Sequence, residues 1–276
     1  MDVRNSLKPS LSVLLSVYHK EQVTYLEQAL CSVWDNQTLK PAQIVLVQDG
    51  PLTAELNAAI AEWQDKLGAI LTIVPLEQNV GLGAALNIGL QHCEHELVAR
   101  MDTDDIAMPN RFEKQFTFMQ NNPEVVACSG LIEEWSQDYS YKISERHLPL
   151  THQEIAKFAK YRSPISHPAV IFRKSAVLAV GGYPNIYPED YPLWGKMLSQ
   201  GYKFANLPDL LLKMRIGNAL TERRGLEFLK GEIKIYRYLC DIGFINQFEF
   251  LFNCISRGLV RLSPAWLKKI FYKYLR

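Results

Sequence analysis

The sequence predicts an α/β fold whose central sheet is Rossmann-like, mostly parallel and flanked by helices, with a C-terminal helical extension. Through the N-terminal half, short β-rich runs alternate with helical patterns, which is typical of parallel strands joined by right-handed crossovers. Polar residues follow the ends of three of these runs, and ligands bind at that edge of a parallel sheet. From about Gly225 the pattern is mostly helical and rich in aromatic residues.

The elements follow in order from the first apolar run. Leu11–Tyr18 has few charges and predicts a buried strand. A helix is expected next, because apolar residues recur at helical spacing at Val23, Leu26, Leu30 and Val33. Strands are then expected at Gln43–Gln48, Ile70–Leu76 and Glu96–Met101, and helices at Thr53–Leu67 and Val80–Cys93. In the less regular second half, strands are expected at Val125–Ile132, near Tyr139–Ser144 and at His167–Phe172.

Size, charge and cysteine content narrow the class of protein. The chain has 276 residues and a formal net charge of +1, so it can bury a full core without disulfides and lacks the basic excess of a nucleic-acid binder. Its five cysteines are widely spaced and form no CxxC pair, which indicates a reducing compartment. Neither a secretory signal nor an apolar run of ~20 residues is visible. We therefore expect a cytoplasmic protein with no nucleic-acid partner.

The most specific signal is the segment that contains Asp102, Asp104 and Asp105. Three carboxylates within four residues repel one another unless they are solvated or bound to a cation. Hard cations such as Mg²⁺ and Mn²⁺ take oxygen ligands and bridge carboxylates to substrate phosphates. The position after a buried strand favours such a metal site. The alternative is a solvated loop in which Asp105 helps to cap a helix near Pro109.

Two further loops follow strand ends. Asp49 can accept hydrogen bonds from a base or ribose, or it can stabilise its own Asp-Gly turn. The small residues from Asn79 through Gly81 and Ala84 to Asn87 begin a helix, whose free amides favour a diphosphate. Tight helix–sheet packing is the alternative. An NAD site is excluded, because the string lacks a full GxGxxG motif and follows the third strand.

An acidic pair, Glu189 and Asp190, precedes an aromatic helix. Such a pair can simply complement the helix dipole. One of its carboxylates can instead act as a general base on a hydroxyl nucleophile. Taken alone, the pair favours the first interpretation.

Together these segments resemble the family 2 inverting glycosyltransferases with the GT-A fold, in particular bacterial enzymes of O-antigen and exopolysaccharide synthesis. The resemblance spans about residues 10–215 and rests on Ser16–Tyr18, Asp49–Gly50, Asn79, Gly81–Asn87, Asp102–Asp105, Pro109, Arg111, Gly181–Tyr183 and Glu189–Asp190. It implies a catalytic domain at 1–215, with a donor-binding part at about 10–108 and an acceptor part at about 109–215. Residues 216–276 would form a membrane-proximal helical extension.

The resemblance also implies roles for individual residues. The donor nucleotide and diphosphate would be held by Ser16, Val17, Tyr18, Asp49, Asn79, Gly81, Ala84, Asp102, Thr103 and Asp104. Mn²⁺ or Mg²⁺ would bind Asp102, Asp104 and Asp105. Asp190 would be the catalytic base, with Glu189 beside it.

Basic residues near the end of the domain are also candidates. Arg215, Arg223 and Arg224 are alternative partners for the diphosphate in a mobile C-terminal loop, as the resemblance implies. His167 either touches donor or acceptor or is a buried structural histidine.

The implied reaction moves one sugar, Gal, Glc or an N-acetylhexosamine, from a UDP-sugar to an acceptor hydroxyl. The acceptor would be a polyprenyl-diphosphate-linked saccharide, and one displacement would invert the anomeric centre to give a β-linkage. A processive synthase is disfavoured, because the sequence has no Gln-x-x-Arg-Trp motif and no transmembrane bundle.

Two alternatives belong to other classes of protein. A sugar-phosphate nucleotidyltransferase would need a Gly-rich loop with Arg and Lys after the first strand, where this chain has Tyr18-His19-Lys20-Glu21. A non-catalytic nucleotide-sugar-binding protein would share the donor site without turnover.

The last 20 residues, 257–276, carry only positive charges among aromatic and aliphatic residues. A basic aromatic helix suits the interface of an anionic bilayer, so a peripheral location on the inner face of the cell membrane is expected. The alternative is a terminal helix that packs on the core with its lysines solvated.

Overall fold

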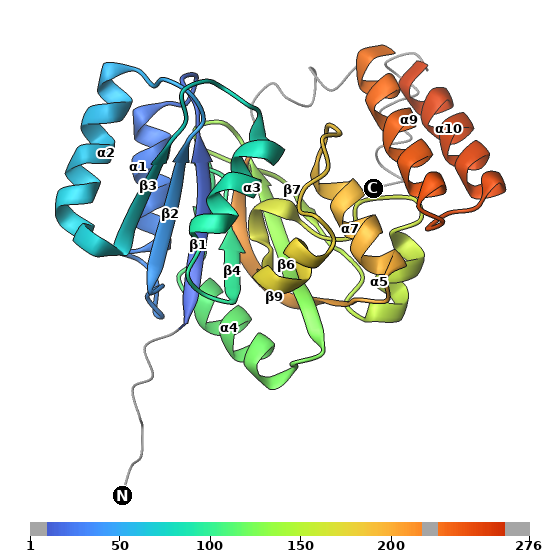
Figure 1. Ribbon diagram of the computed structural model, residues 1–276, viewed down its shortest axis with the longest axis horizontal. Helices are drawn as coiled ribbons and strands as arrows, with labels where there is room; N and C mark the ends of the chain where they lie inside the picture. The colour runs from blue at the N-terminus through green and yellow to red at the C-terminus, as the bar shows by residue number, and fades with distance from the viewer. Residues whose placement is uncertain (1–9, 217–225, 263–276) are drawn as a thin grey trace, which may run out of the picture.

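The computed structural model describes residues 10–216 and 226–262. At its centre is a mixed sheet of nine strands in this part of the chain, in the order β3-β2-β1-β4-β8-β6-β9-β5, with β7 paired to β6. Helices lie on both faces of the sheet, and a pair of helices projects from the end far from β3 (Figure 1). The expected α/β architecture is therefore present.

The N-terminal half is parallel throughout. Strand β1 pairs with β2 and β4, and β2 pairs with β3. Every element expected here is found, with ends displaced by at most two residues. The bounds are β1 Leu11–Val17, α1 Val23–Val33, β2 Gln43–Gln48, α2 Ala54–Leu67, η1 Gly68–Ile70, β3 Leu71–Pro75, α3 Leu82–His92 and β4 Leu97–Arg100.

Strand β1 explains why the prediction succeeded in this half. Side chains alternate between the faces of a strand, and a parallel sheet is covered on both. Val13 and Leu15 belong to the core cluster that contains residues of α1 and α2, whereas Leu14 belongs to the cluster that contains residues of α3. All three are fully buried, so a continuous apolar run is required.

The second half of the chain adds both antiparallel and parallel strand pairs to the sheet. Its bounds are β5 Ile106–Ala107, α4 Arg111–Asn121, β6 Val125–Trp135, β7 Lys142–Arg146, α5 His152–Phe158, η2 His167–Ala169, β8 Ile171–Arg173, α6 Lys174–Ala179, α7 Asp190–Ser199 and β9 Lys203–Arg215. Strand β8 runs antiparallel to both β4 and β6, and only β9 pairs with β6 in parallel.

Three expectations in this half need correction. The segment expected as a strand at His167–Phe172 begins as the short helix η2, and only its end joins β8. The strand expected near Tyr139–Ser144 begins at Lys142, because Tyr139 occupies a turn at φ 58°. Strand β9 was not expected.

The C-terminal extension is a helical hairpin of α9 (Leu226–Asp241) and α10 (Gln247–Leu262). Helix α9 packs on α7 through a small core of Tyr191, Ile235, Tyr236 and Leu239. The contact is close, because a Cβ on Gly195 of α7 would lie 2.1 Å from Leu239 Cδ2. Within the described residues, no helix is both long enough and apolar enough to cross a membrane.

Candidate active site

A cleft of about 610 Å³ lies at the carboxyl ends of β1, β2 and β4, where the topology predicts a ligand site. It brings together segments that are far apart in the sequence. Ten of the predicted site residues line it, namely Ser16, Tyr18, Asp49, Asn79, Gly81, Asp102, Thr103, Asp104, Asp105 and Arg215. The side chains of Glu21, Leu82, Tyr187 and Met214 also line it and were not predicted.

Two of the predicted donor residues do not line this cleft. The side chain of Val17 is fully buried in the core, and its carbonyl accepts a 2.8 Å hydrogen bond from the Asp49 amide. A contact of Val17 with a ligand is therefore restricted to its backbone. Ala84 lies in α3 beside an adjoining pocket that also contains Gly83 and Glu189.

Three carboxylates crowd one wall of the cleft. Asp102, Asp104 and Asp105 offer ligand oxygens that all lie within 4.8 Å of one another. Burial, followed by the charges of Asp102 and Glu21, raises the pKa of Asp104 to about 7. Burial, followed by the charges of Asp104 and Asp102, also raises the pKa of Asp105 well above its ordinary value. A divalent cation would relieve this repulsion.

The hydrogen bonds of Asp105 fit a cation as well. Its Oδ1 accepts a 2.8 Å hydrogen bond from the Arg215 amide at the end of β9. Its Oδ2 is buried and has no hydrogen-bond partner among the described residues. A buried carboxylate oxygen without a donor is costly, and a metal ion would satisfy it. The alternative in which Asp105 caps α4 is not observed, since the residue before that helix is Asn110.

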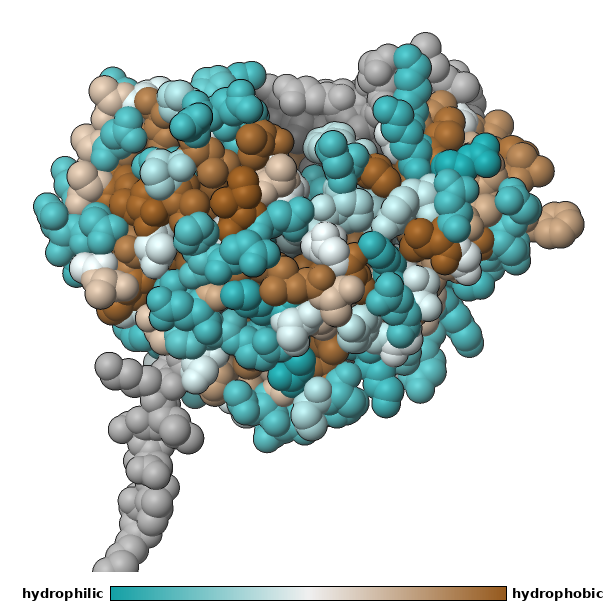
Figure 2. All heavy atoms as spheres, in the orientation of Figure 1, coloured by the Kyte–Doolittle hydropathy of each residue, from teal (hydrophilic) through white to brown (hydrophobic). Residues whose placement is uncertain are grey.

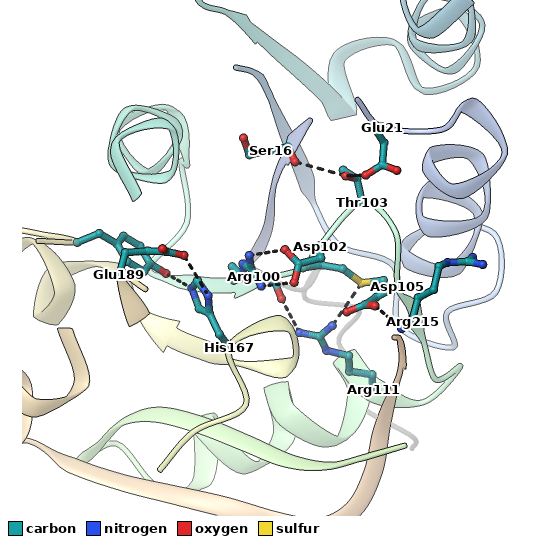
Figure 3. Close-up of polar contacts among 12 residues, drawn as sticks. Ser16, Glu21, Arg100, Asp102, Thr103, Asp105, Arg111, His167, Glu189 and Arg215 are labelled. Atoms are coloured by element: carbon teal, nitrogen blue, oxygen red, sulfur yellow. Dashed lines mark hydrogen bonds and ion pairs between the residues drawn. The ribbon is translucent and has the colours of Figure 1, made fainter. Parts of the chain in front are cut away.

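Two buried arginines lie behind these carboxylates, and neither role was predicted from the sequence. The Arg100 guanidinium holds Asp102 through two hydrogen bonds, one of them 2.7 Å between Nη1 and Oδ2 (Figure 3). Arg111 donates from Nη2 to the Arg100 carbonyl at 2.7 Å. Burial and the charge of Arg100 lower the pKa of Arg111 to about 9. An arginine at the end of an otherwise apolar strand was the available signal for Arg100.

The loop after β1 adds a fourth carboxylate to the wall that holds the three aspartates. Thr103 donates its hydroxyl to Glu21 Oε2 at 2.6 Å, which joins the loop after β1 to the loop after β4 (Figure 3). Burial raises the pKa of Tyr18, with smaller contributions from Glu21 and Asp104. Glu21 therefore adds negative charge to the wall that already holds the three aspartates.

Asp49 organises the loop in front of α3. Its Oδ1 accepts from the Val80 amide at 2.7 Å, and its Oδ2 accepts from the Gly81 amide and the Asn79 side chain at 3.2 and 3.0 Å. Gly50 is required beside it, because φ is +87° and a Cβ would lie 2.6 Å from the Asn79 nitrogen. Asp49 thus fixes the conformation of the loop that precedes α3.

Arg215 lies at the end of strand β9, which corrects its expected place in a mobile loop. Its guanidinium stacks 3.6 Å from the Tyr25 ring and 4.3 Å from the Tyr139 ring. It donates to the Asp104 carbonyl at 2.9 Å. These contacts tie β9 to the aspartate loop. Arg223 and Arg224, the alternative candidates, lie outside the described residues.

The acidic pair divides between two pockets. Glu189 lines the pocket next to the cleft. A Cβ added to Gly83 would lie 3.0 Å from the Cβ of Glu189. Asp190 accepts a 3.1 Å hydrogen bond from Ser163 and lines a separate pocket of about 140 Å³ with Tyr236 and Arg257. Burial raises the pKa of both carboxyl groups. Each carboxylate therefore faces a different space.

His167 belongs to a buried network beside Glu189. Its Nε2 lies 3.0 Å from the Tyr183 hydroxyl, and its Nδ1 lies 3.9 Å from Glu189 Oε1 (Figure 3). Burial, with the nearby Arg100 charge, lowers the pKa of His167 well below its ordinary value. The neutral imidazole thus packs behind Glu189 and does not line the donor cleft.

Comparison with solved structures identifies the fold. Staphylococcus aureus TarS 1-349 in complex with UDP-GlcNAc superposes with a TM-score of 0.62 at 16% identity, covering 94% of this chain and 77% of that one. The mannosyltransferase PcManGT from Pyrobaculum calidifontis, in complex with GDP-Man and Mn²⁺, gives 0.61 at 17%, covering 95% and 72%. The fold is that of the GT-A glycosyltransferases.

Sequence comparison identifies the family. The glycosyl transferase family 2 pattern matches residues 12–180. The chain is 42% identical over 267 residues to the amylovoran biosynthesis glycosyltransferase AmsE of Erwinia amylovora, covering 95% of this chain and 97% of the relative. It is 39% identical over 267 residues to a UDP-Gal:α-D-GlcNAc-diphosphoundecaprenol β-1,3-galactosyltransferase of Escherichia coli, covering 96% of each. The chain belongs to glycosyltransferase family 2 and is an enzyme of that class.

Proposed function

We propose that the protein transfers a single Gal, Glc or N-acetylhexosamine residue from a UDP-sugar to a hydroxyl of a polyprenyl-diphosphate-linked saccharide, with inversion. The observation that carries the proposal is the buried Asp105 oxygen without a donor beside Asp102 and Asp104, at the carboxyl edge of the sheet. The substrates named for the Escherichia coli relative support a galactosyl donor and a lipid-linked acceptor. That relative matches along almost the whole chain, which supports a similar pair of substrates.

The donor would lie along the cleft. The loop at Ser16–Tyr18 and the Asp49 region would hold the uracil and ribose. The diphosphate would lie at the N-terminus of α3, where no atom lies within 4 Å of a Cβ added to Gly81 and the helix amides favour an anion. Asp102, Asp104 and Asp105 would hold Mn²⁺ or Mg²⁺, which when bound stabilises the charge of the leaving diphosphate as a Lewis acid.

The acceptor would approach from the opposite side of the reacting carbon. Asp190 would accept the proton of the attacking hydroxyl, since it is a half-buried residue that lines the second pocket. Its raised pKa suits a general base. Glu189, packed between Gly83 and His167, would support the wall between the two spaces. One displacement without a protein nucleophile would convert an α-linked donor into a β-linked product.

The two alternatives from the sequence receive less support. A nucleotidyltransferase would place basic residues after the first strand, but here that loop brings the Glu21 carboxylate into the cleft. A binding module would have no need of a carboxylate facing a second pocket.

An enzyme that acts on a lipid-linked acceptor would work at the inner face of the cell membrane. Most of the basic 257–276 segment proposed for that contact lies outside the described residues.

The test uses the purified full chain with Mn²⁺, a panel of UDP-hexoses and UDP-N-acetylhexosamines, and a soluble acceptor carrying GlcNAc-diphosphate on a short alkyl chain. We expect transfer from one donor, loss of transfer with EDTA, and a β-linkage by the anomeric coupling constant in NMR. An α-linked product would contradict inversion. UDP binding without transfer to any acceptor would favour the binding module.

A further inference from the structure

Helix α10 presents its more apolar face to solvent. Five side chains on that face are each more than half exposed, namely Phe248, Leu251, Phe252, Ile255 and Leu259. Their positions i, i+3, i+4, i+7 and i+11 place them on one side of the helix. We call these five residues the α10 stripe. In Figure 2, hydrophobic side chains gather at the edge of the molecule where Figure 1 places α10.

The opposite face of α10 does the packing and is more polar. Asn253 is buried and donates to the Lys160 carbonyl at 2.9 Å. Glu249 pairs with the Lys160 ammonium group at 2.7 Å, and Arg257 donates to the Tyr161 carbonyl at 2.8 Å. Polar contacts therefore seat the helix on the catalytic domain. The side chains of the α10 stripe remain more than half exposed despite this packing, so their composition calls for another contact.

Exposed basic residues lie on the other helix of the hairpin. Lys230, Lys234 and Arg237 are exposed and follow one another at helical spacing along α9. The Arg237 guanidinium lies over the ring of Phe250 in α10, 4.9 Å from its centroid, so the basic row adjoins the helix that carries the stripe. A hairpin that carries exposed apolar and aromatic side chains on one helix and a basic row on the other matches the interior and the headgroups of an anionic bilayer.

The same hairpin closes the pocket of Asp190. Tyr236 from α9 and Arg257 from α10 line that pocket together with Asp190. The stripe is continuous with it through Tyr161, whose ring packs edge-on against Phe252 with centroids 6.1 Å apart and whose carbonyl accepts from Arg257. A surface that holds the stripe would therefore lie close to the pocket.

We propose that the α10 stripe docks on an anionic lipid bilayer and brings the pocket of Asp190 to the membrane, where a lipid-linked acceptor is held. This rests on the proposed function for the nature of the acceptor. The contact lies within residues 248–259, so it differs from one made by the end of the chain alone.

The test is flotation of the full chain with vesicles of phosphatidylglycerol and phosphatidylcholine in equal parts. The variant Leu251→Gln/Ile255→Gln changes two stripe residues and leaves Phe252 on Tyr161. The control Ile143→Gln/Leu150→Gln changes two exposed apolar residues on and near β7. We expect the stripe variant to bind vesicles at least about tenfold more weakly, with wild-type binding by the control. Raised salt and pure phosphatidylcholine vesicles should also weaken binding.

Transfer to the soluble acceptor separates the two proposals. The stripe variant should keep wild-type turnover on the short-chain acceptor and lose it on a long-chain acceptor embedded in vesicles. A wild-type chain that does not bind vesicles, or a stripe variant that binds as well as wild type, would overturn the inference even if transfer occurs. Light scattering that shows a wild-type dimer and a monomeric stripe variant would likewise overturn it, in favour of a second copy on the stripe. Failure of transfer to every acceptor would instead count against the proposed function.

Discussion

The Arg100 guanidinium donates hydrogen bonds from Nη1 and Nη2 to the two carboxylate oxygens of Asp102, and Arg100 is itself almost fully buried. The pair sets the direction of a carboxylate at the edge of the proposed metal site. A planar fork can do this, whereas a single ammonium group cannot. The consequence is that the geometry of the cleft depends on a side chain that does not line it.

Replacement of Arg100 by lysine should therefore impair function without removing the charge. We expect Arg100→Lys to lower kcat/KM by at least about tenfold and to weaken Mn²⁺ binding, because Asp102 loses its bidentate partner. The control is Arg173→Lys, because the Arg173 guanidinium also donates hydrogen bonds, but to backbone carbonyls at the far end of β8. Calorimetric Mn²⁺ titrations that give equal affinities for Arg100→Lys and wild type would disprove this role.

The aspartate cluster predicts an unusual pH dependence of stability in metal-free protein. The pKa of Asp104 is raised from 3.8 to about 7, so the folded state binds more protons than the unfolded state between these values. Stability should therefore fall as pH rises from about 4 to about 7. Saturating Mn²⁺ should reverse the trend, because the metal binds the deprotonated groups.

Melting temperatures across this range, in EDTA and in Mn²⁺, check the prediction. Asp104→Asn removes the titrating group and should flatten the metal-free profile, while it lowers transfer by roughly 10²-fold or more. Asp209→Asn changes an aspartate that pairs with Lys114 away from the cleft and serves as the control. A metal-free melting temperature that rises steadily with pH would show that the cluster is not strained in this way.

The acidic pair can be separated by two conservative substitutions. Asp190→Asn should lower kcat by roughly 10²-fold or more, because the amide cannot take the proton of the attacking hydroxyl. UDP binding should stay unchanged. Glu189→Gln should be milder, because this side chain packs on Gly83 beside neutral His167. Single-turnover rates and UDP titrations for both variants decide the matter. If Glu189→Gln is the more damaged enzyme and Asp190→Asn transfers normally, the base is Glu189.

The contact between α3 and Glu189 can be probed from the helix side. A Cβ on Gly83 would lie 3.0 and 3.2 Å from Glu189 Cβ and Cγ, so Gly83→Ala should displace that side chain. Alanine is the better helix former by about 1 kcal/mol, so stability should change little while activity falls by about tenfold. Gly258→Ala, where no atom lies within 4 Å of the added Cβ, should leave soluble-acceptor activity intact. Full activity of Gly83→Ala would argue against this packing role.

Local patterning was sufficient to predict the parallel half of the fold. Strand β1 and strand β2 are apolar on both faces, and the helices between them carry clear periodic patterns. Strand β9 was not predicted, because its sequence contains Pro208 and Asp209 and its register against β6 shifts. Residues 203–215 can be assigned to a strand only once their pairing with β6 in the sheet is known.

The cleft shows the same division. The aspartates follow a strand end and could be found from that position alone. Arg100 and Glu21 could not be assigned roles, because each acts through a partner, Asp102 or Thr103, whose orientation arises from tertiary packing. Arg215 was one of three candidates and lines the cleft, but its stacking on Tyr25 joins residues far apart in the sequence.

Strand β9 also sets a limit on how the chain can be divided. The family 2 pattern ends at residue 180, yet β9 lies between β6 and β5 in the sheet, and its last amide bonds to Asp105. A fragment cut at the end of that pattern would lack an inner strand and would leave β6 with an open edge prone to self-association. Its aspartate loop would also lose the amide that orients Asp105. The smallest piece suitable for expression or for grafting into another enzyme therefore extends at least through Arg215.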